Sequence, residues 1–191
     1  MHPMSTIKGG NLQKGIFIKY KNEPYEVTKA EFYAPGKGSA ICRTKLKSVK
    51  TANTVEFTFK SNESVEELDV MAREMQFSYM DGEDIVFMDP RTYEQVNVSR
   101  ALLEDKIGYL IAEQNMYLVF LDEKVIGVRF PQKVTLKVTH AEDDVAGDTV
   151  NSPKKMVTVE TGIQVYAPLF IKKGEKIIID TTTGEYVGRS N

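Results

Sequence analysis

The sequence predicts an all-β protein made of several small barrels or sandwiches. Its apolar residues recur mostly at every second position, as they do in strands with one buried face. Turn-forming residues interrupt these alternating runs at short intervals. Only one segment, residues 99–112, has the spacing of an amphipathic helix. Many short strands with at most one helix are typical of small β-barrels.

The first third of the chain contains several strand patterns. Residues 16–20 alternate and lead through a turn at residues 22–23 into residues 24–27, which predicts a pair of neighbouring strands. Another strand is expected over residues 40–46. Residues 54–59 alternate again and predict a strand with one half-buried face.

The middle of the chain begins after a polar run, residues 61–64, and we place a domain boundary just after Glu66. An Asp-Gly pair at 81–82 separates two apolar runs and predicts a hairpin within residues 75–88. A second hairpin is expected over residues 116–128.

The stretch of residues 99–112 between these hairpins is the predicted helix. Ser99 is its candidate N-cap. Gly108 weakens this prediction, because glycine lowers helix propensity. Five apolar side chains follow Ser99 at helical spacing: Leu102, Leu103, Ile107, Leu110 and Ile111.

A Phe-Pro pair at 130–131 marks the second predicted boundary, and strand patterns resume after it. The polar residues 140–155 predict a long surface loop. The expected strands of this last part are residues 134–138, 156–159, 163–166, 176–180 and 185–189.

Three units of similar size follow from these boundaries: residues 1–66, 67–130 and 131–191. The formal net charge of the whole chain is −2, which by itself argues against a nucleic-acid partner. Divided at the boundaries, however, the charge is +5, −7 and 0. A segregation of this size favours a polyanion as the partner of the first unit and not of the middle one. Random variation of surface charge is the alternative.

Several classes of protein are disfavoured by composition. No apolar run approaches the length of a membrane span, and the first residues lack the apolar core of a secretory signal. The lone cysteine, Cys42, cannot form an intramolecular disulfide, which suits a reducing cytosol, and we expect an inert thiol. No His and Cys residues have zinc-ligand spacing, so we expect neither a metal nor a cofactor.

Enzyme chemistry is also poorly supported. The run Pro35-Gly36-Lys37-Gly38-Ser39 superficially resembles a phosphate-binding P-loop. Gly38 follows the lysine where Ser or Thr is required, and Glu31 stands in place of the first glycine. No nucleophile–base pair or pair of carboxylates stands out elsewhere, and the chain is therefore expected not to be an enzyme.

The same run is nevertheless the most informative feature of the sequence. Pro35, Gly36 and Gly38 are turn formers between two strand patterns, which predicts that Lys37 projects from the tip of a loop. An ordinary hairpin turn with a solvated lysine is the alternative.

The residues that follow the loop are basic. Arg43, Lys45 and Lys47 alternate along the next strand, so their side chains share one face. A basic face beside a projecting lysine fits contacts with a phosphate backbone, because binding by Lys and Arg releases counterions.

At this point the sequence resembles the bacterial elongation factor P family over essentially its whole length. The C-terminal segments, residues 159–162, 168–171 and 180–189, match most strongly. Further matching segments are residues 14–15, 35–38, 43–47, 57–60, 79–82, 87–88, 147–149 and 174–175.

The resemblance implies three β domains in an L shape similar to that of tRNA, a KOW/SH3-like barrel followed by two OB barrels. It implies a cytoplasmic, monomeric translation factor that binds the 70S ribosome between the P and E sites and relieves stalling at consecutive prolines. Partners would be rRNA, mRNA and the P-site peptidyl-tRNA. Lys37 would reach the CCA end of that tRNA after extension by a lysine-modifying enzyme.

The resemblance also implies roles for residues of the last domain. Gly147, Asp148 and Thr149 would contact mRNA in the E site, and Tyr186 and Arg189 would act near the small subunit, although Tyr186 also fits a packing role. Ser39 stands where glutamine often follows in members modified by β-lysylation. Val145, Ala146 and Val150 also depart from the commoner pattern. A paralogue of the family, or a generic OB-fold protein that binds single-stranded RNA, is therefore an alternative.

Overall fold

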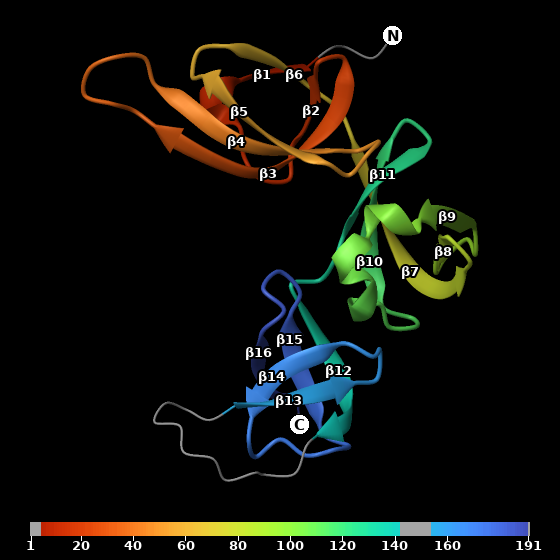
Figure 1. The fold of residues 1–191 in the computed structure, drawn as a ribbon. Helices are drawn as coiled ribbons and strands as arrows, with labels where there is room; N and C mark the ends of the chain where they lie inside the picture. The colour runs from red at the N-terminus through yellow and green to blue at the C-terminus, as the bar shows by residue number, and fades with distance from the viewer. Residues whose placement is uncertain (1–4, 142–153, 191) are drawn as a thin grey trace. The chain divides into compact units, whose positions relative to one another are not determined.

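The computed structural model describes residues 5–141 and 154–190, and strands dominate this part of the chain (Figure 1). Its 16 described strands form three sheets of six, five and five strands. The predicted all-β class is therefore confirmed. None of the helices in the described segments has the length and hydrophobicity that crossing a bilayer requires.

The first sheet has the strand order β1-β6-β2-β3-β4-β5. The predicted strand pair is confirmed, because Phe17 pairs with Glu26 and Tyr20 with Glu23. Inward-facing side chains from its strands, including Val27 and Leu46, form one buried cluster. The strands are β1 (Ser5–Lys8), β2 (Phe17–Tyr20), β3 (Glu23–Tyr33), β4 (Ile41–Ser48), β5 (Thr54–Lys60) and β6 (Ser64–Glu67).

The second sheet has the strand order β11-β10-β7-β8-β9. The hairpin predicted from the Asp-Gly pair is confirmed, since Asp81 at the end of β7 pairs with Asp84 at the start of β8. The second predicted hairpin corresponds to the neighbouring strands β10 and β11. The bounds are β7 (Met71–Asp81), β8 (Asp84–Met88), β9 (Gln95–Ser99), β10 (Asn115–Leu121) and β11 (Lys124–Arg129).

The helix predicted over residues 99–112 is wrong in type and extent. The segment forms two short 3₁₀ helices, η2 (Arg100–Leu102) and η3 (Glu104–Tyr109), and Ser99 makes no capping hydrogen bond with its side chain. Packing explains the difference. Leu103 and Leu110 are buried while Tyr109 and Ile111 pack on the core of the third sheet, so the apolar residues do not share the single face of an amphipathic helix. The backbone at Gly108 also lies so close to Ile163 that a Cβ there would overlap with its side chain.

The third sheet has the strand order β14-β13-β12-β15-β16. Its alternating residues, such as Val134, Leu136 and Val138 on β12, are fully buried as the sequence predicts. The strands are β12 (Lys133–Ala141), β13 (Lys154–Val159), β14 (Gln164–Pro168), β15 (Lys176–Asp180) and β16 (Tyr186–Ser190).

One further short element belongs to the first part of the chain: a 3₁₀ turn, η1 (Gly9–Asn11), follows β1 of the first sheet.

By compactness the chain divides into two units. Unit 1 comprises Met1–Arg73 and Leu118–Val128, and unit 2 comprises Glu74–Tyr117 and Arg129–Asn191. The polar run of residues 61–64 lies at the turn into β6, a strand of the first sheet, where Glu67 still pairs with Ser5. The first sheet therefore continues past residue 66.

Unit 1 contains a second buried cluster besides the core of the first sheet. Phe17, Val119 and Ile126 meet in it, and each of them is less than 5% exposed. Half-buried apolar residues, among them Leu68 and Leu121, surround this cluster. The side of β2 that carries Phe17 is therefore covered by residues that come much later in the chain.

Candidate nucleic-acid interface

The loop between β3 and β4, residues 34–40, extends well beyond the rest of the first sheet (Figure 1). Its two strands stay paired up to Tyr33 and Ile41, so the loop stands on a hydrogen-bonded base. Because the strands are paired up to this point, residues 34–40 form a projecting loop with a fixed base, which we call the Lys37 arm.

Lys37 lies at the middle of this loop, and its side chain is exposed. Within residues 5–141 and 154–190 no hydrogen bond or ion pair holds the Lys37 ammonium group. Half-buried Pro35 precedes it, and Gly36 and Gly38 flank it directly. A flexible four-carbon chain that ends in a compact charge is therefore presented at the tip, with little bulk on either side.

The strand that leaves the loop carries the basic residues singled out in the sequence. Arg43 and Lys45 are exposed on the outer face of β4, and Lys47 on the same side is half-buried. The residues between them, including Thr44, face the core, and the Thr44 hydroxyl donates a hydrogen bond of 2.8 Å to the Phe57 carbonyl. The spacing of the three cations therefore places them as the sequence predicts.

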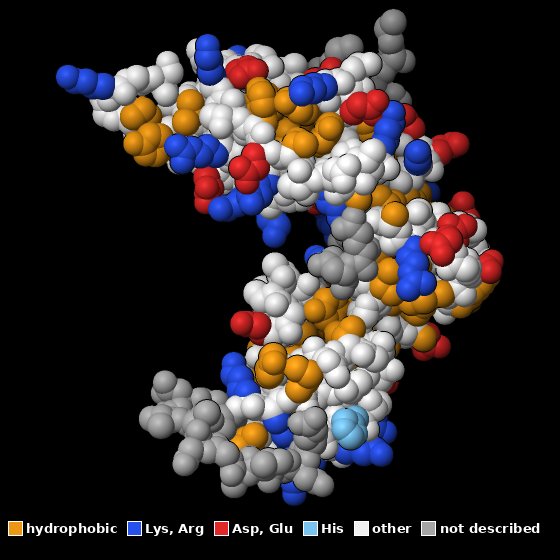
Figure 2. All heavy atoms as spheres, viewed as in Figure 1, with side chains coloured by type: hydrophobic (Ala, Val, Ile, Leu, Met, Phe, Trp, Pro, Cys, Tyr) orange, Lys and Arg blue, Asp and Glu red, His pale blue; other side chains and the backbone are white. Residues whose placement is uncertain are grey.

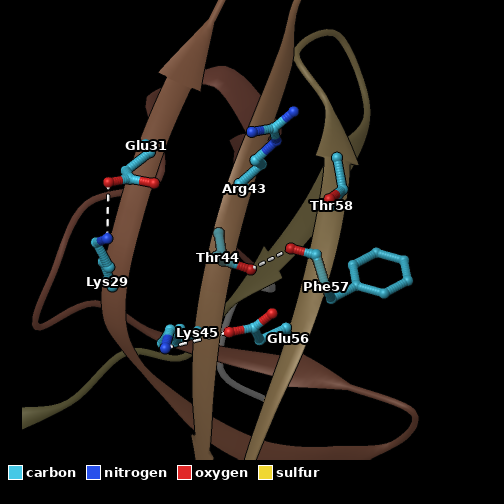
Figure 3. A pocket seen from close by; sticks show the side chains of 8 residues that line it. All are labelled: Lys29, Glu31, Arg43, Thr44, Lys45, Glu56, Phe57 and Thr58. Atoms are coloured by element: carbon cyan, nitrogen blue, oxygen red, sulfur yellow. Dashed lines mark hydrogen bonds and ion pairs between the residues drawn. The ribbon is translucent and has the colours of Figure 1, made fainter.

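Neighbouring strands bring carboxylates onto this face (Figure 3). Glu31 on β3 pairs with Lys29 at 2.7 Å, and Glu56 on β5 pairs with Lys45 at 3.1 Å. The hydrogen bond from Lys29, followed by its positive charge, lowers the pKa of Glu31 from its ordinary value. Arg43 instead lies over the Tyr33 ring, with its Cζ 5.7 Å from the ring centre.

These side chains line a shallow depression of about 480 Å³ on the face of β3, β4 and β5. Its charged lining residues are three cations and two carboxylates, so the face is less basic than β4 alone suggests. Figure 2 shows this mixture as adjoining basic, acidic and hydrophobic side chains on the face near the projecting loop. The depression is lined by Lys29, Glu31, Arg43, Thr44, Lys45, Glu56, Phe57 and Thr58.

Sequence reasoning missed both carboxylates and the aromatic ring. Glu31 and Glu56 come from different strands, and only the register places them opposite Arg43 and Lys45. Tyr33 stands at the last paired position before the loop. Alternation along β3 puts residues 29, 31 and 33 on one face. The sequence would therefore have indicated that Glu31 and Tyr33 share a face, if the strand had been predicted to extend to residue 33.

Cys42 lies on the inner side of β4 and is 1% exposed. Burial raises the pKa of its thiol, so little thiolate forms at neutral pH. Among the side chains that the structure describes, no group of three or more His, Cys, Asp or Glu residues is placed to hold a metal ion.

The candidate residues of the last part of the chain are only partly described. Gly147, Asp148 and Thr149 lie outside the described residues. Tyr186 is half-buried and packs against the core of the third sheet. Arg189 lies over the Phe170 ring.

The Phe170 ring and the Glu175 carboxylate hold the Arg189 guanidinium. Its Cζ lies 5.4 Å from the centre of the Phe170 ring, and its Nη1 donates to Oε1 of Glu175 at 3.3 Å. Phe170 and Glu175 lie in segments that carry the family resemblance, but nothing in the sequence indicated their contact with Arg189, which forms only when β16 lies beside β15.

Comparison with known proteins covers almost the whole chain. Residues 8–65 match the model of the elongation factor P KOW-like domain, residues 70–128 that of its OB domain, and residues 134–189 that of its C-terminal domain. The elongation factor P of Leptospira biflexa is 44% identical over 180 residues, which cover 94% of this chain and 96% of the relative. That of Desulfitobacterium hafniense is 42% identical over 184 residues, covering 96% and 100%.

A solved structure of initiation factor 5A from Methanococcus jannaschii is also similar. It shares 22% identity, with a TM-score of 0.47, over 67% of this chain and 98% of that one.

Proposed function

The chain belongs to the elongation factor P family, and from this premise we propose that it binds the 70S ribosome between the P and E sites and stimulates peptide-bond formation at consecutive prolines. The family model matches and the identity over nearly the full chain show a translation factor of this family. The site of binding and the relief of stalling are the finer parts of the proposal.

The observation that carries the proposal is the exposed Lys37 arm on a paired β3–β4 base. A thin cationic tip with glycine on both sides fits a narrow, negatively charged channel such as the one around the CCA end of P-site tRNA. By ordering that end, Lys37 favours the reactive geometry of the two substrates, which is an entropic contribution to catalysis. The ribosome forms the bond, and the factor itself acts on no covalent bond.

The other candidate residues have supporting roles in this proposal. Arg43, Lys45 and Lys47 contact the RNA backbone, and Gly147, Asp148 and Thr149 contact mRNA in the E site. Tyr186 and Arg189 act near the small subunit. A lysine-modifying enzyme lengthens Lys37, whose exposure leaves it accessible.

The domain limits belong to the same proposal: residues 1–66 form the KOW-like domain, and residues 67–130 and 131–191 form the two OB domains. The protein works as a monomer in the cytoplasm, where ribosomes translate.

Replacement of Lys37 tests the role of the arm. Lys37→Ala is expected to abolish relief of stalling at three consecutive prolines in a reconstituted translation system, because the tip then carries no charge. Its circular dichroism and unfolding curve should match those of the unmodified parent, since Lys37 is exposed. Undiminished relief by Lys37→Ala would contradict the role given to this residue.

The matched control is Lys173→Ala, which removes an exposed lysine from a different turn. It is expected to relieve stalling as well as the parent. In parallel, binding of the parent to 70S ribosomes and to free single-stranded RNA separates the proposal from a generic RNA-binding role. Tight, salt-sensitive binding to free RNA without preference for ribosomes would contradict the proposal.

A further inference from the structure

We propose that Tyr33 is a stacking platform for an unpaired RNA base at the root of the Lys37 loop, and that Arg43 holds its ring in place. This inference rests on the proposed function, because it assumes that the loop meets RNA. It adds to the charge of Lys37 a second contact with the RNA, made by stacking on the Tyr33 ring.

The Tyr33 ring is open to solvent although it lies on a strand. Tyr33 is 54% exposed although it is paired with Ile41 through the backbone. Large apolar rings are normally buried on folding, and leaving one in water forgoes that stabilisation. Its place directly before the projecting loop gives an exposed ring the access that a binding surface needs.

Phe32, the neighbouring exposed ring, is a weaker candidate. It points to the other side of β3, where it is 59% exposed. A Cβ on Gly10 would lie 3.3 Å from its Cε2, so the ring rests close to the backbone of η1. Phe32 thus has the backbone of η1 beside its ring, whereas Tyr33 has only Arg43 as its ring partner among the described contacts.

Arg43 gives the site its chemical character. The two carboxylates of this face are each held by a lysine, Glu31 by Lys29 and Glu56 by Lys45, while Arg43 lies over the Tyr33 ring. A cation over one face of the ring restrains it and leaves the opposite face for a ligand. The guanidinium also places a positive charge beside the ring. An RNA base stacked on the ring would bring the phosphate of its own nucleotide close to that charge.

An unpaired nucleobase is the ligand that fits these features. Single-stranded RNA is recognised by stacking of splayed bases on aromatic rings beside Arg or Lys. A base-paired stem hides its base faces, and an acidic peptide without aromatic residues offers no flat ring to stack on Tyr33. The combination of Tyr33, Arg43 and the Lys37 arm therefore favours a single-stranded RNA end over a duplex or an acidic protein.

The experiment compares Tyr33→Leu with Tyr33→Phe in the stalled-ribosome assay, as a function of factor concentration. Loss of the ring is expected to raise the half-saturating concentration about fivefold or more, which is the scale of one base–aromatic stack. Tyr33→Phe should stay near the parent, because it keeps the ring and loses only the hydroxyl. An equal loss in both variants would contradict stacking.

Salt dependence separates stacking from charge. Tyr33→Leu should leave the slope of log affinity against log salt unchanged, because no phosphate contact is lost. Arg43→Gln should make that slope shallower by roughly 0.7 to 1. A shallower slope for Tyr33→Leu would contradict the assignment.

A photoreactive phenylalanine analogue at position 33 identifies the partner directly. Crosslinks to a base in a single-stranded RNA segment are expected, and crosslinks confined to protein or to duplex RNA would overturn the inference. In the stalled-ribosome assay, the matched control for Tyr33→Leu is Tyr117→Leu, which removes a strand tyrosine of 49% exposure and should leave the half-saturating concentration unchanged.

The parent and Lys37→Ala are run beside these variants. If the parent itself fails to relieve stalling, the proposed function has failed. If the parent relieves stalling and Tyr33→Leu matches it at every concentration, only the stacking platform has failed.

Discussion

At the residue scale, the two glycines beside Lys37 have different reasons to be there. Gly38 has a φ of +110°, in the region that side chains with a Cβ rarely adopt, whereas Gly36 does not lie in that region. Neither position is crowded: a Cβ at Gly36 would meet nothing within 4 Å, and one at Gly38 only the Pro35 ring at 3.7 Å. Backbone conformation, not space, therefore distinguishes the two.

Gly38→Ala and Gly36→Ala form a matched pair that tests this difference. Alanine at 38 is expected to raise the free energy of the loop conformation by about 1–2 kcal/mol, the cost of a left-handed conformation. The loop conformation should change in Gly38→Ala and stay close to that of the parent in Gly36→Ala, and relief of stalling should fall further in Gly38→Ala. Backbone chemical shifts of the loop report the conformation, and equal effects of the two substitutions would contradict the argument.

At the element scale, the segment of residues 99–112 shows how tertiary contacts override a local pattern. Its apolar spacing favours a helix, but its residues pack in several directions, since Leu103 and Leu110 are buried and Tyr109 packs on the core of the third sheet. Hydrogen bonds such as Lys106 N–H to the Leu103 carbonyl, at 2.8 Å, close turns of three residues.

Gly108→Ala is the substitution that this packing forbids. The new methyl group would overlap with Cγ2 of Ile163, so the variant should lose about 1–3 kcal/mol of unfolding free energy, the usual cost of overpacking. Urea unfolding followed by circular dichroism measures the loss. The matched control is Gly188→Ala, where a Cβ meets nothing within 4 Å and φ is not positive.

A double variant makes the same test specific. If the overlap is the cause, Gly108→Ala combined with Ile163→Ala should be less destabilised than the sum of the single variants. Strict additivity would show that the cost of Gly108→Ala arises elsewhere.

At the scale of the whole molecule, charge is segregated along the chain and then balanced locally. The sum of −2 conceals a first segment of +5 and a second of −7. On the face of β3, β4 and β5, ion pairs offset two of the three cations.

Unit 1 also has an acidic depression of about 690 Å³ with Leu68, Val70, Met71 and Phe120 in its lining. Its carboxylates are Glu66, Glu67, Asp69, Asp122 and Glu123.

The stability of unit 1 depends on a contact between distant parts of the chain. Phe17 is 2% exposed and packs with Val119 and Ile126, and a Cβ on Gly127 would lie 3.1 Å from its Cζ. The backbone at Gly127 thus comes close to the Phe17 ring. This cluster joins the first sheet to residues 118–128 within the unit.

Phe17→Ala is therefore expected to destabilise the protein by about 3–5 kcal/mol, because it leaves a cavity in a buried cluster. Phe32→Ala removes the same ring from an exposed position and should cost about 1 kcal/mol or less. Unfolding in urea measures both. Similar losses for the two substitutions would contradict the importance of the Phe17 cluster.

Much of the fold and part of the candidate site follow from the sequence alone. Period-two alternation predicts strands such as β4 and β12, because one face of each is buried, and the Asp-Gly pair predicts its hairpin. The turn formers around Lys37 predict an exposed arm, and the spacing of Arg43, Lys45 and Lys47 predicts their common face. These features are local, since they depend only on neighbours a few positions apart.

Tertiary structure decided what depends on register and on distant contacts. It set Glu31 and Glu56 among the cations of β4, because pairing of β3, β4 and β5 aligns residues that no local pattern relates. It replaced the expected helix with 3₁₀ turns, whose apolar residues pack in several directions and not along one helix face. It also placed Arg43 over Tyr33. Strands β1, β6 and β9 were not predicted from the sequence. The sequence alone thus determined most of the strands and the projecting lysine, and the tertiary structure determined which charges and rings surround that lysine.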